Sequence, residues 1–116
     1  MTAMSEPTPP SPAPSQPLRW SEDEIFAVMS NHARRRIIKA LASGQGRTAT
    51  DLTSTTGKKL DATIKDCCIL AKAGFLQMSP DPVDGRKMRY TLPPHLPITP
   101  TATGWELDFG CCVLRV

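Results

Sequence analysis

The chain has 116 residues, a formal net charge of +3 at pH 7 and only 5% aromatic residues. Its length predicts one small domain, and so few aromatic side chains argue against a broad stacking surface for bases or sugars. Residues 31–92 carry twelve basic and five acidic residues, net +7, between flanks of −3 and −1. Such a segment favours a polyanionic partner, with nucleic acid the first candidate and an ordinary solvated surface the alternative.

The sequence also argues against membrane insertion, secretion and catalysis. No apolar run approaches the roughly 20 residues that cross a bilayer, and no basic start followed by an apolar stretch indicates a secretory signal. We therefore expect a cytoplasmic protein whose thiols stay reduced. There is no glycine-rich phosphate loop, nucleophile–base pairing or cofactor motif, so we expect neither an enzyme nor a bound cofactor.

The first 45 residues predict a tail followed by two helices. Residues 1–19 contain six prolines and little apolar surface, which is typical of a disordered tail. Ser21 and Glu24 have the spacing of a capping box, and the apolar pattern after them predicts a helix over residues 22–29. Asn31 is a typical N-cap, so we expect a second helix through the sequence HARRRIIKAL.

Two further helices and a hairpin follow. A short third helix is expected to end at Gly57, and a fourth over about 60–73 is expected to end before Gly74. The sequence FLQMS then predicts a strand, PDPVDG a turn and RKMRYTL a returning strand with alternating apolar residues.

Residues 93–116 predict an extended segment with a strand. Trp105, Leu107 and Phe109 alternate with acidic residues, as in a half-buried strand. An open, apolar and nearly uncharged edge would aggregate. The end of the chain is therefore expected to pair with the wing sheet or with a second subunit. We hypothesise that it builds, with the first helix, either a homodimer or an extra sheet.

The order of these elements resembles a winged helix-turn-helix. Four segments resemble ArsR-type regulators in order and spacing: MSNHARRRIIKAL at the second helix, TATDLTSTTG at the third, LDATIKDCCILAKAGFLQ at the recognition helix and DGRKMRYTL at the wing. The resemblance covers residues 24–92. It implies an α+β, mainly α fold, with a winged helix-turn-helix domain over residues 20–92, a two-stranded wing and a C-terminal β extension.

The resemblance also implies a function and a set of site residues. Members of this family are transcriptional regulators that bind double-stranded DNA, usually as homodimers, with the recognition helix in the major groove and the wing on the backbone or in the minor groove. Carried over by position, the candidate DNA-contacting residues are Lys58, Lys59, Asp61, Ala62, Lys65, Arg86, Lys87 and Arg89.

Acidic residues on the recognition helix leave a second function open. The same resemblance implies that Leu60 and Asp66 lie on the exposed side with the candidate residues. It implies that Thr63, Cys67 and Leu70 lie on the buried side, which their helical spacing also indicates. Asp61 is expected to cap the helix start, or to accept a hydrogen bond from a cytosine amino group. Asp66 would repel a phosphate. A protein-interaction module on the same scaffold is therefore the alternative to DNA binding.

The arginine run and the cysteines have structural interpretations. We expect at least one of Arg34, Arg35 and Arg36 to pair with Asp23 or Glu24 of the first helix. The adjacent pairs Cys67–Cys68 and Cys111–Cys112 lack the spacing of a zinc site, so we expect core filling and no metal ligands. Thiol-based metal or redox sensing, with one thiol from each pair brought together, is the alternative.

Overall fold

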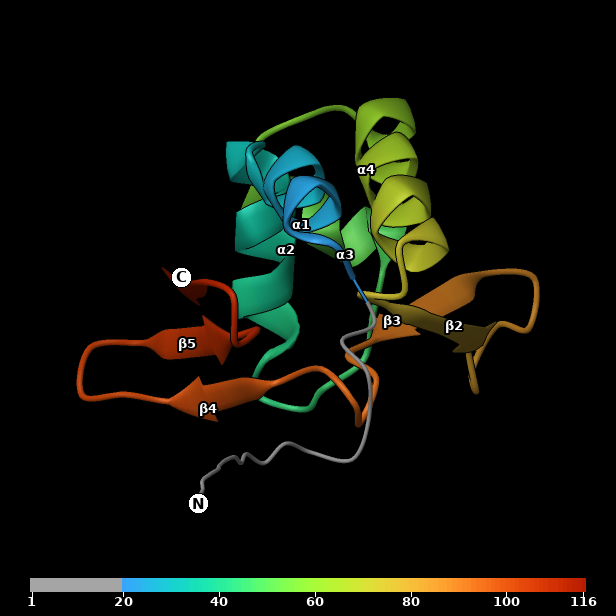
Figure 1. The fold of residues 1–116 in the computed structure, drawn as a ribbon. Helices are drawn as coiled ribbons and strands as arrows, with labels where there is room; N and C mark the ends of the chain where they lie inside the picture. Colours follow the sequence, from blue (N-terminus) through green and yellow to red (C-terminus); the bar gives the residue numbers. More distant parts are fainter. Residues whose placement is uncertain (1–19) are drawn as a thin grey trace, which may run out of the picture.

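The computed structural model describes residues 20–116, and the predicted disordered tail over 1–19 lies outside them. The described chain folds into four helices and two small antiparallel sheets (Figure 1). This confirms the expected mixed architecture. The helices are α1 (Glu22–Met29), α2 (His32–Leu41), α3 (Ala49–Thr56) and α4 (Leu60–Lys72).

The first two helices begin where the sequence predicts. The Ser21 hydroxyl accepts a hydrogen bond from the Glu24 amide at 3.1 Å, and the Glu24 carboxylate accepts one from the Ser21 amide at 2.9 Å. The Asn31 side-chain oxygen accepts from the amides of Ala33 and Arg34. These bonds satisfy donors that no helical carbonyl reaches, so α1 and α2 have defined starts.

The next two helices differ in how they begin. Thr48 and Asp51 form a second capping box at the start of α3, which ends at Gly57 with φ of 70°. The N-cap of α4 is Lys59, and it makes no side-chain capping bond. The expected capping role of Asp61 is therefore wrong. Asp61 lies in the first helical turn, where its charge interacts favourably with the helix dipole.

The wing belongs to a three-stranded sheet. Strand β3 (Met88–Thr91) pairs with β2 (Gln77–Pro80) on one side and with the short β1 (Arg47–Thr48) on the other. Strand β2 begins two residues later than FLQMS predicts, because the Phe75 amide donates to the Leu70 carbonyl of α4 at 2.9 Å and pairing with β3 starts at Gln77. Strand β1 is only two residues long, which is too short for an alternating sequence pattern to predict it.

The C-terminal segment forms a separate sheet in the order β4–β5–β6. Its strands are β4 (Ile98–Pro100), β5 (Trp105–Asp108) and β6 (Val113–Arg115). The last strand pairs with β5 of its own segment and not with the wing sheet, which confirms the expected extra sheet. A tight turn allows this, because Phe109 donates to the Cys112 carbonyl at 2.9 Å and Gly110 has φ of 87°.

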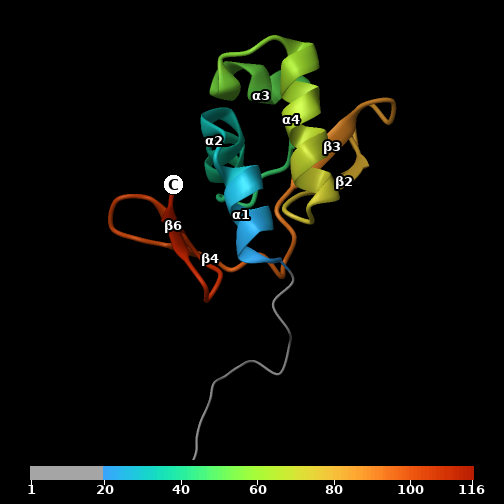
Figure 2. The ribbon, with the colours of Figure 1, turned by 45° about the horizontal axis from the view of Figure 1, so that its top comes forward.

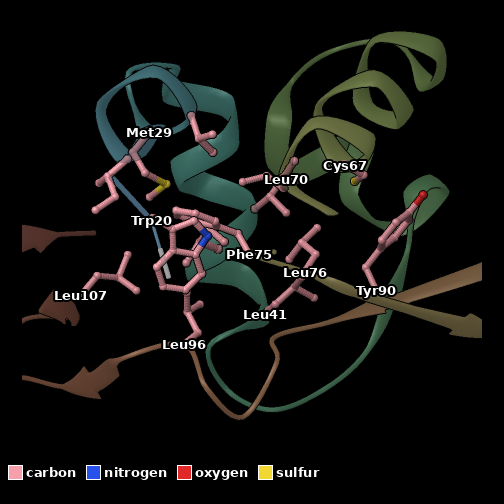
Figure 3. Packing of buried hydrophobic residues seen from close by; sticks show 14 of the residues in the cluster. Trp20, Met29, Leu41, Cys67, Leu70, Phe75, Leu76, Tyr90, Leu96 and Leu107 are labelled. Atoms are coloured by element: carbon pink, nitrogen blue, oxygen red, sulfur yellow. The ribbon is translucent and has the colours of Figure 1, made fainter. Parts of the chain in front are cut away.

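Aromatic packing joins this C-terminal sheet to the helices. The Trp20 ring lies 4.8 Å from the Phe75 ring and 5.5 Å from the Phe109 ring, centroid to centroid. Its indole nitrogen also donates to the Ala73 carbonyl at the end of α4. Leu107 is buried in the same cluster (Figure 3). Residues after the wing thus share one core with the helices.

The helices stand between the two sheets, so the wing and the C-terminal sheet lie on opposite sides of the molecule (Figure 2). The wing strands β2 and β3 lie beside α4, and the C-terminal sheet lies beside α1. Within residues 20–116, none of the helices has the length and apolar character needed to cross a membrane.

Candidate nucleic-acid interface

A threonine pair holds the turn between α3 and α4. Thr63 is fully buried, and its hydroxyl donates to the Lys59 carbonyl at 3.0 Å and lies 2.9 Å from the Thr56 hydroxyl. Cys67 and Leu70 are buried on the same side of α4, which confirms the predicted inner face. The tight turn at Gly57 and these buried contacts fix the angle at which α4 leaves α3.

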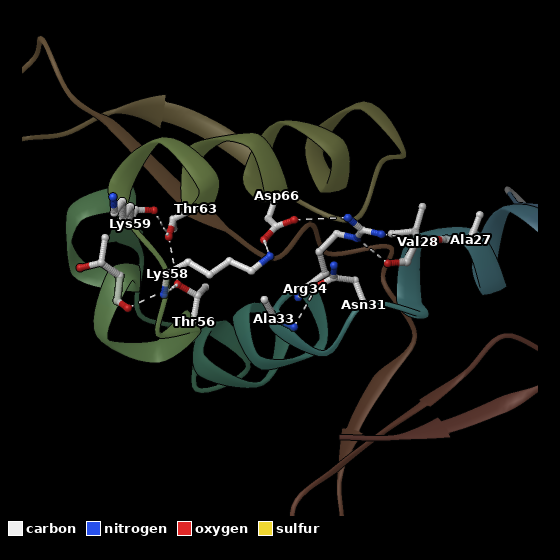
Figure 4. A network of polar contacts seen from close by, with 11 residues as sticks. Ala27, Val28, Asn31, Ala33, Arg34, Thr56, Lys58, Lys59, Thr63 and Asp66 are labelled. Carbon is white, nitrogen blue, oxygen red and sulfur yellow. Dashed lines mark hydrogen bonds and ion pairs between the residues drawn. The ribbon is translucent and has the colours of Figure 1, made fainter.

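Asp66 is a correction to the predicted exposed face. Its side chain is only 6% exposed, and its two oxygens accept from Arg34 Nη1 at 3.2 Å and Lys58 Nζ at 2.9 Å (Figure 4). The residue lies at the flank of the buried stripe, where the periodicity alone does not decide its environment. Since Asp66 faces two cations inside the protein, it does not repel a phosphate at the surface.

The partners of the arginine cluster also differ from the prediction. Arg34 Nε donates to the Val28 carbonyl at 2.7 Å, and Arg35 donates to the Met29 carbonyl. These are carbonyls at the C-terminal end of α1, where cations are favoured. The expected pairing with Asp23 or Glu24 is wrong, because α2 begins beside the last turn of α1 and those acids lie in the first.

Most candidate residues of α4 lie on its outer face. Lys59, Asp61 and Lys65 are exposed, and Ala62 is half-buried. Two apolar residues share this face, with Leu60 42% and Ile64 39% exposed. Cys68 and Lys72 extend it toward the end of the helix. Lys58 is partly exposed at the turn, although its ammonium group bonds to Asp66.

The wing supplies a second group of cations. Arg86 and Lys87 are exposed beside the turn, and Arg86 Nε lies 3.3 Å from the Asp84 carboxylate. Arg89 is half-buried, and its side chain lies so close to Gly46 that a Cβ at that position would collide with it. The wing cations therefore differ, with two exposed to solvent and one packed against the chain before β1.

A hollow of about 370 Å³ separates α4 from the wing. Its lining is mostly apolar, with basic residues at one side: Thr48, Ala49, Thr50, Leu60, Ile64, Arg86, Lys87, Met88 and Tyr90. The start of α3 forms the third wall. No sequence pattern predicts this hollow, because its walls come from three separate segments.

The four cysteines are free thiols in different environments. Cys67 is fully buried, and its burial, with smaller effects of Cys68 and Asp66, raises its pKa from 9.0 to about 12. This confirms its predicted place in the core. The Cys111 and Cys112 sulfurs lie 3.9 Å apart in the β5–β6 turn. Over the described range 20–116, no three His, Cys, Asp or Glu residues are arranged to hold a metal ion.

Several solved structures share this arrangement of helices and wing. The adhesin competence repressor AdcR from Streptococcus pyogenes is 28% identical with a TM-score of 0.52, over 59% of this chain and 49% of that one. The reduced form of MarR from E. coli is 20% identical with a TM-score of 0.52, over 60% and 52%. A mutant E. coli MarR complexed with operator DNA is 17% identical with a TM-score of 0.52, over 62% and 51%.

The fold is that of the winged-helix transcription regulators. The chain spans about half the length of the solved structures it matches. No protein-family model and no curated protein sequence matches it.

Proposed function

We propose that this protein is a transcriptional regulator that binds double-stranded DNA, with α4 in the major groove and the wing on the backbone or in the minor groove. The observation that carries the proposal is the helix-turn-helix geometry. Lys59 and Lys65 are exposed on α4, and Arg86 and Lys87 are exposed on the wing, across the hollow that α4 also lines. A helix fits the major groove, and cations beside it neutralise phosphates.

The matched structures support this role. AdcR is named a repressor, and one matched form of MarR is complexed with operator DNA. Within the winged-helix regulators, the four sequence segments that resemble ArsR-type proteins favour that subgroup. Regulators of this kind are not enzymes, which agrees with the lack of catalytic and cofactor motifs in the sequence.

Each site residue has a proposed part in binding. The exposed side chains of Lys59, Lys65, Arg86 and Lys87 contact phosphates or base edges. Asp61 accepts a hydrogen bond from a cytosine amino group. The small side chain of Ala62 allows close approach of α4 to the groove. Lys58 and Arg89 complete the proposed set of DNA contacts. Lys58 also pairs with Asp66 at the turn before α4, and Arg89 also packs against Gly46 before β1.

Removing the wing cations should flatten the salt dependence of DNA binding. The variants Arg86→Ala and Lys87→Ala are each expected to reduce the slope of log K against log salt by roughly one unit, because each lost phosphate contact releases about one counterion fewer. Fluorescence anisotropy on a labelled duplex measures this slope.

Arg115→Ala provides the control, because Arg115 is 84% exposed in side chain and lies on β6, away from the wing. An Arg115→Ala slope that fell as much as the wing variants would contradict the assignment of the wing. No affinity for duplex DNA at low salt would exclude DNA binding altogether.

A protein-interaction module is the second candidate function. Leu60, Ile64 and Met88 are all about 40% exposed and line the hollow on the same surface. An exposed apolar group of this kind is also typical of a surface that binds another protein. Absence of any affinity for duplex DNA at low salt would favour this candidate.

A homodimer is part of the proposal, because operators of such regulators are usually read by two-fold dimers. Phe26 of α1 and Val113 of β6 are about half exposed outside the proposed interface. We expect the full chain to sediment as a dimer at micromolar concentration, and Phe26→Glu or Val113→Glu to shift it toward monomer, since a buried unpaired charge weakens association.

Val83→Glu, at a fully solvated position in the wing turn, is expected to leave the dimer intact. A full chain that sediments as a monomer at every concentration would exclude the homodimer. These point variants are preferable to truncation after Leu92, which would remove Leu107 and Phe109 from the core.

A further inference from the structure

The first two turns of α4 offer only four exposed side chains to a DNA groove: Leu60, Asp61, Ile64 and Lys65. The other polar groups of these turns are engaged inside the protein. Thr63 is buried with its hydroxyl bonded to Lys59 and Thr56, and Asp66 is paired with two cations. Half of the accessible reading groups are therefore large and apolar.

The major groove presents one apolar group, the C5 methyl of thymine, among its hydrogen-bond donors and acceptors. We propose that Leu60 and Ile64 determine operator specificity by packing against thymine methyl groups. This inference rests on the proposed DNA binding by α4. It assigns a preference for A·T pairs at the base pairs that face the first two turns of the helix.

The surroundings of these residues favour a DNA surface over a protein surface. Lys59 and Lys65 flank them on α4, and Arg86 and Lys87 line the other side of the hollow. Exposed cations on both sides can hold two phosphate backbones, which leaves the apolar pair opposite the base edges between them. Asp66, the acid expected to disturb this field, is neutralised internally.

Uracil substitution tests the inference directly, because deoxyuridine keeps the base pair and removes only the methyl group. Sites are first selected with the full chain from a random duplex pool, and each thymine of the selected site is then replaced in turn. We expect a loss of about fourfold in affinity at one or two positions of each half-site, the value for burying one methyl-sized group.

The variants Leu60→Ala and Ile64→Ala should each abolish the uracil penalty at one position, while binding of the corresponding uracil duplex changes less than about twofold. Both residues are exposed enough that the fold should tolerate the change. Met78→Ala, a comparably exposed apolar residue on β2 that does not line the hollow, should keep the full penalty.

The outcomes separate this inference from the proposed function. Salt-dependent binding with equal affinity for thymine and uracil duplexes at every position would overturn the thymine contact and leave DNA binding in place. A penalty that persists in both α4 variants would also overturn it. No binding to any duplex at low salt would overturn the inference together with the proposed function.

Discussion

Replacing Asp66 with alanine should lower the free energy of unfolding by about 3 kcal/mol, because removal of one partner leaves buried charge without compensation. Arg34 would lose its carboxylate partner while its side chain is only 13% exposed. Lys58 is more exposed and can turn to solvent, which limits the loss. Urea unfolding followed by circular dichroism measures the change.

Asp61→Ala is the matched control, an exposed acid on the same helix. Its loss should stay below about 1 kcal/mol, the size of a helix-dipole interaction at the surface. Asp66→Asn keeps a hydrogen-bond acceptor and should fall between the two alanine variants. If Asp66→Ala and Asp61→Ala unfolded at the same urea concentration, the buried pair would contribute nothing to stability.

Phe109→Ala should cost about 3–4 kcal/mol, in the range for a buried phenylalanine replaced by alanine. Phe109 is 2% exposed, and its ring lies 5.5 Å from Trp20 and 5.7 Å from Phe75. The substitution leaves a cavity where the C-terminal sheet meets the helices. Trp20 lies in this cluster, so tryptophan fluorescence during urea unfolding detects the change alongside circular dichroism.

Arg115→Ala provides the comparison on the same sheet, because the Arg115 side chain is 84% exposed and lies outside the core. It should change stability by less than about 0.5 kcal/mol. The two spectroscopic probes should report a single transition, as expected for one shared core. A separate early transition for the C-terminal sheet would mean that it does not stabilise the helices.

The inner face of α4 shows how far sequence periodicity reaches. Thr63, Cys67 and Leu70 were predicted to be buried from their spacing and are buried. Asp66 beside them was predicted to be exposed, and its burial depends on cations contributed by other segments. Arg34 is 32 residues away, and its approach to α4 is determined by packing rather than by local pattern.

The proposed DNA interface was also only partly predictable from the sequence. The resemblance to ArsR-type regulators implied that Lys59, Lys65, Arg86 and Lys87 are exposed, and the structure has them exposed. The hollow beside Leu60 was not predictable, because a recess between three segments has no pattern in any one of them. The role of these residues in DNA binding remains a prediction for the salt and uracil experiments.

The sequence by itself determined the order and the limits of the helices. Capping by Ser21 and Asn31, and chain reversal at Gly57, act within about four residues, so they can be read along the chain. Only the tertiary structure decided which charges pair and which strands join. Those contacts connect distant residues, and their free energy depends on burial that the complete fold creates.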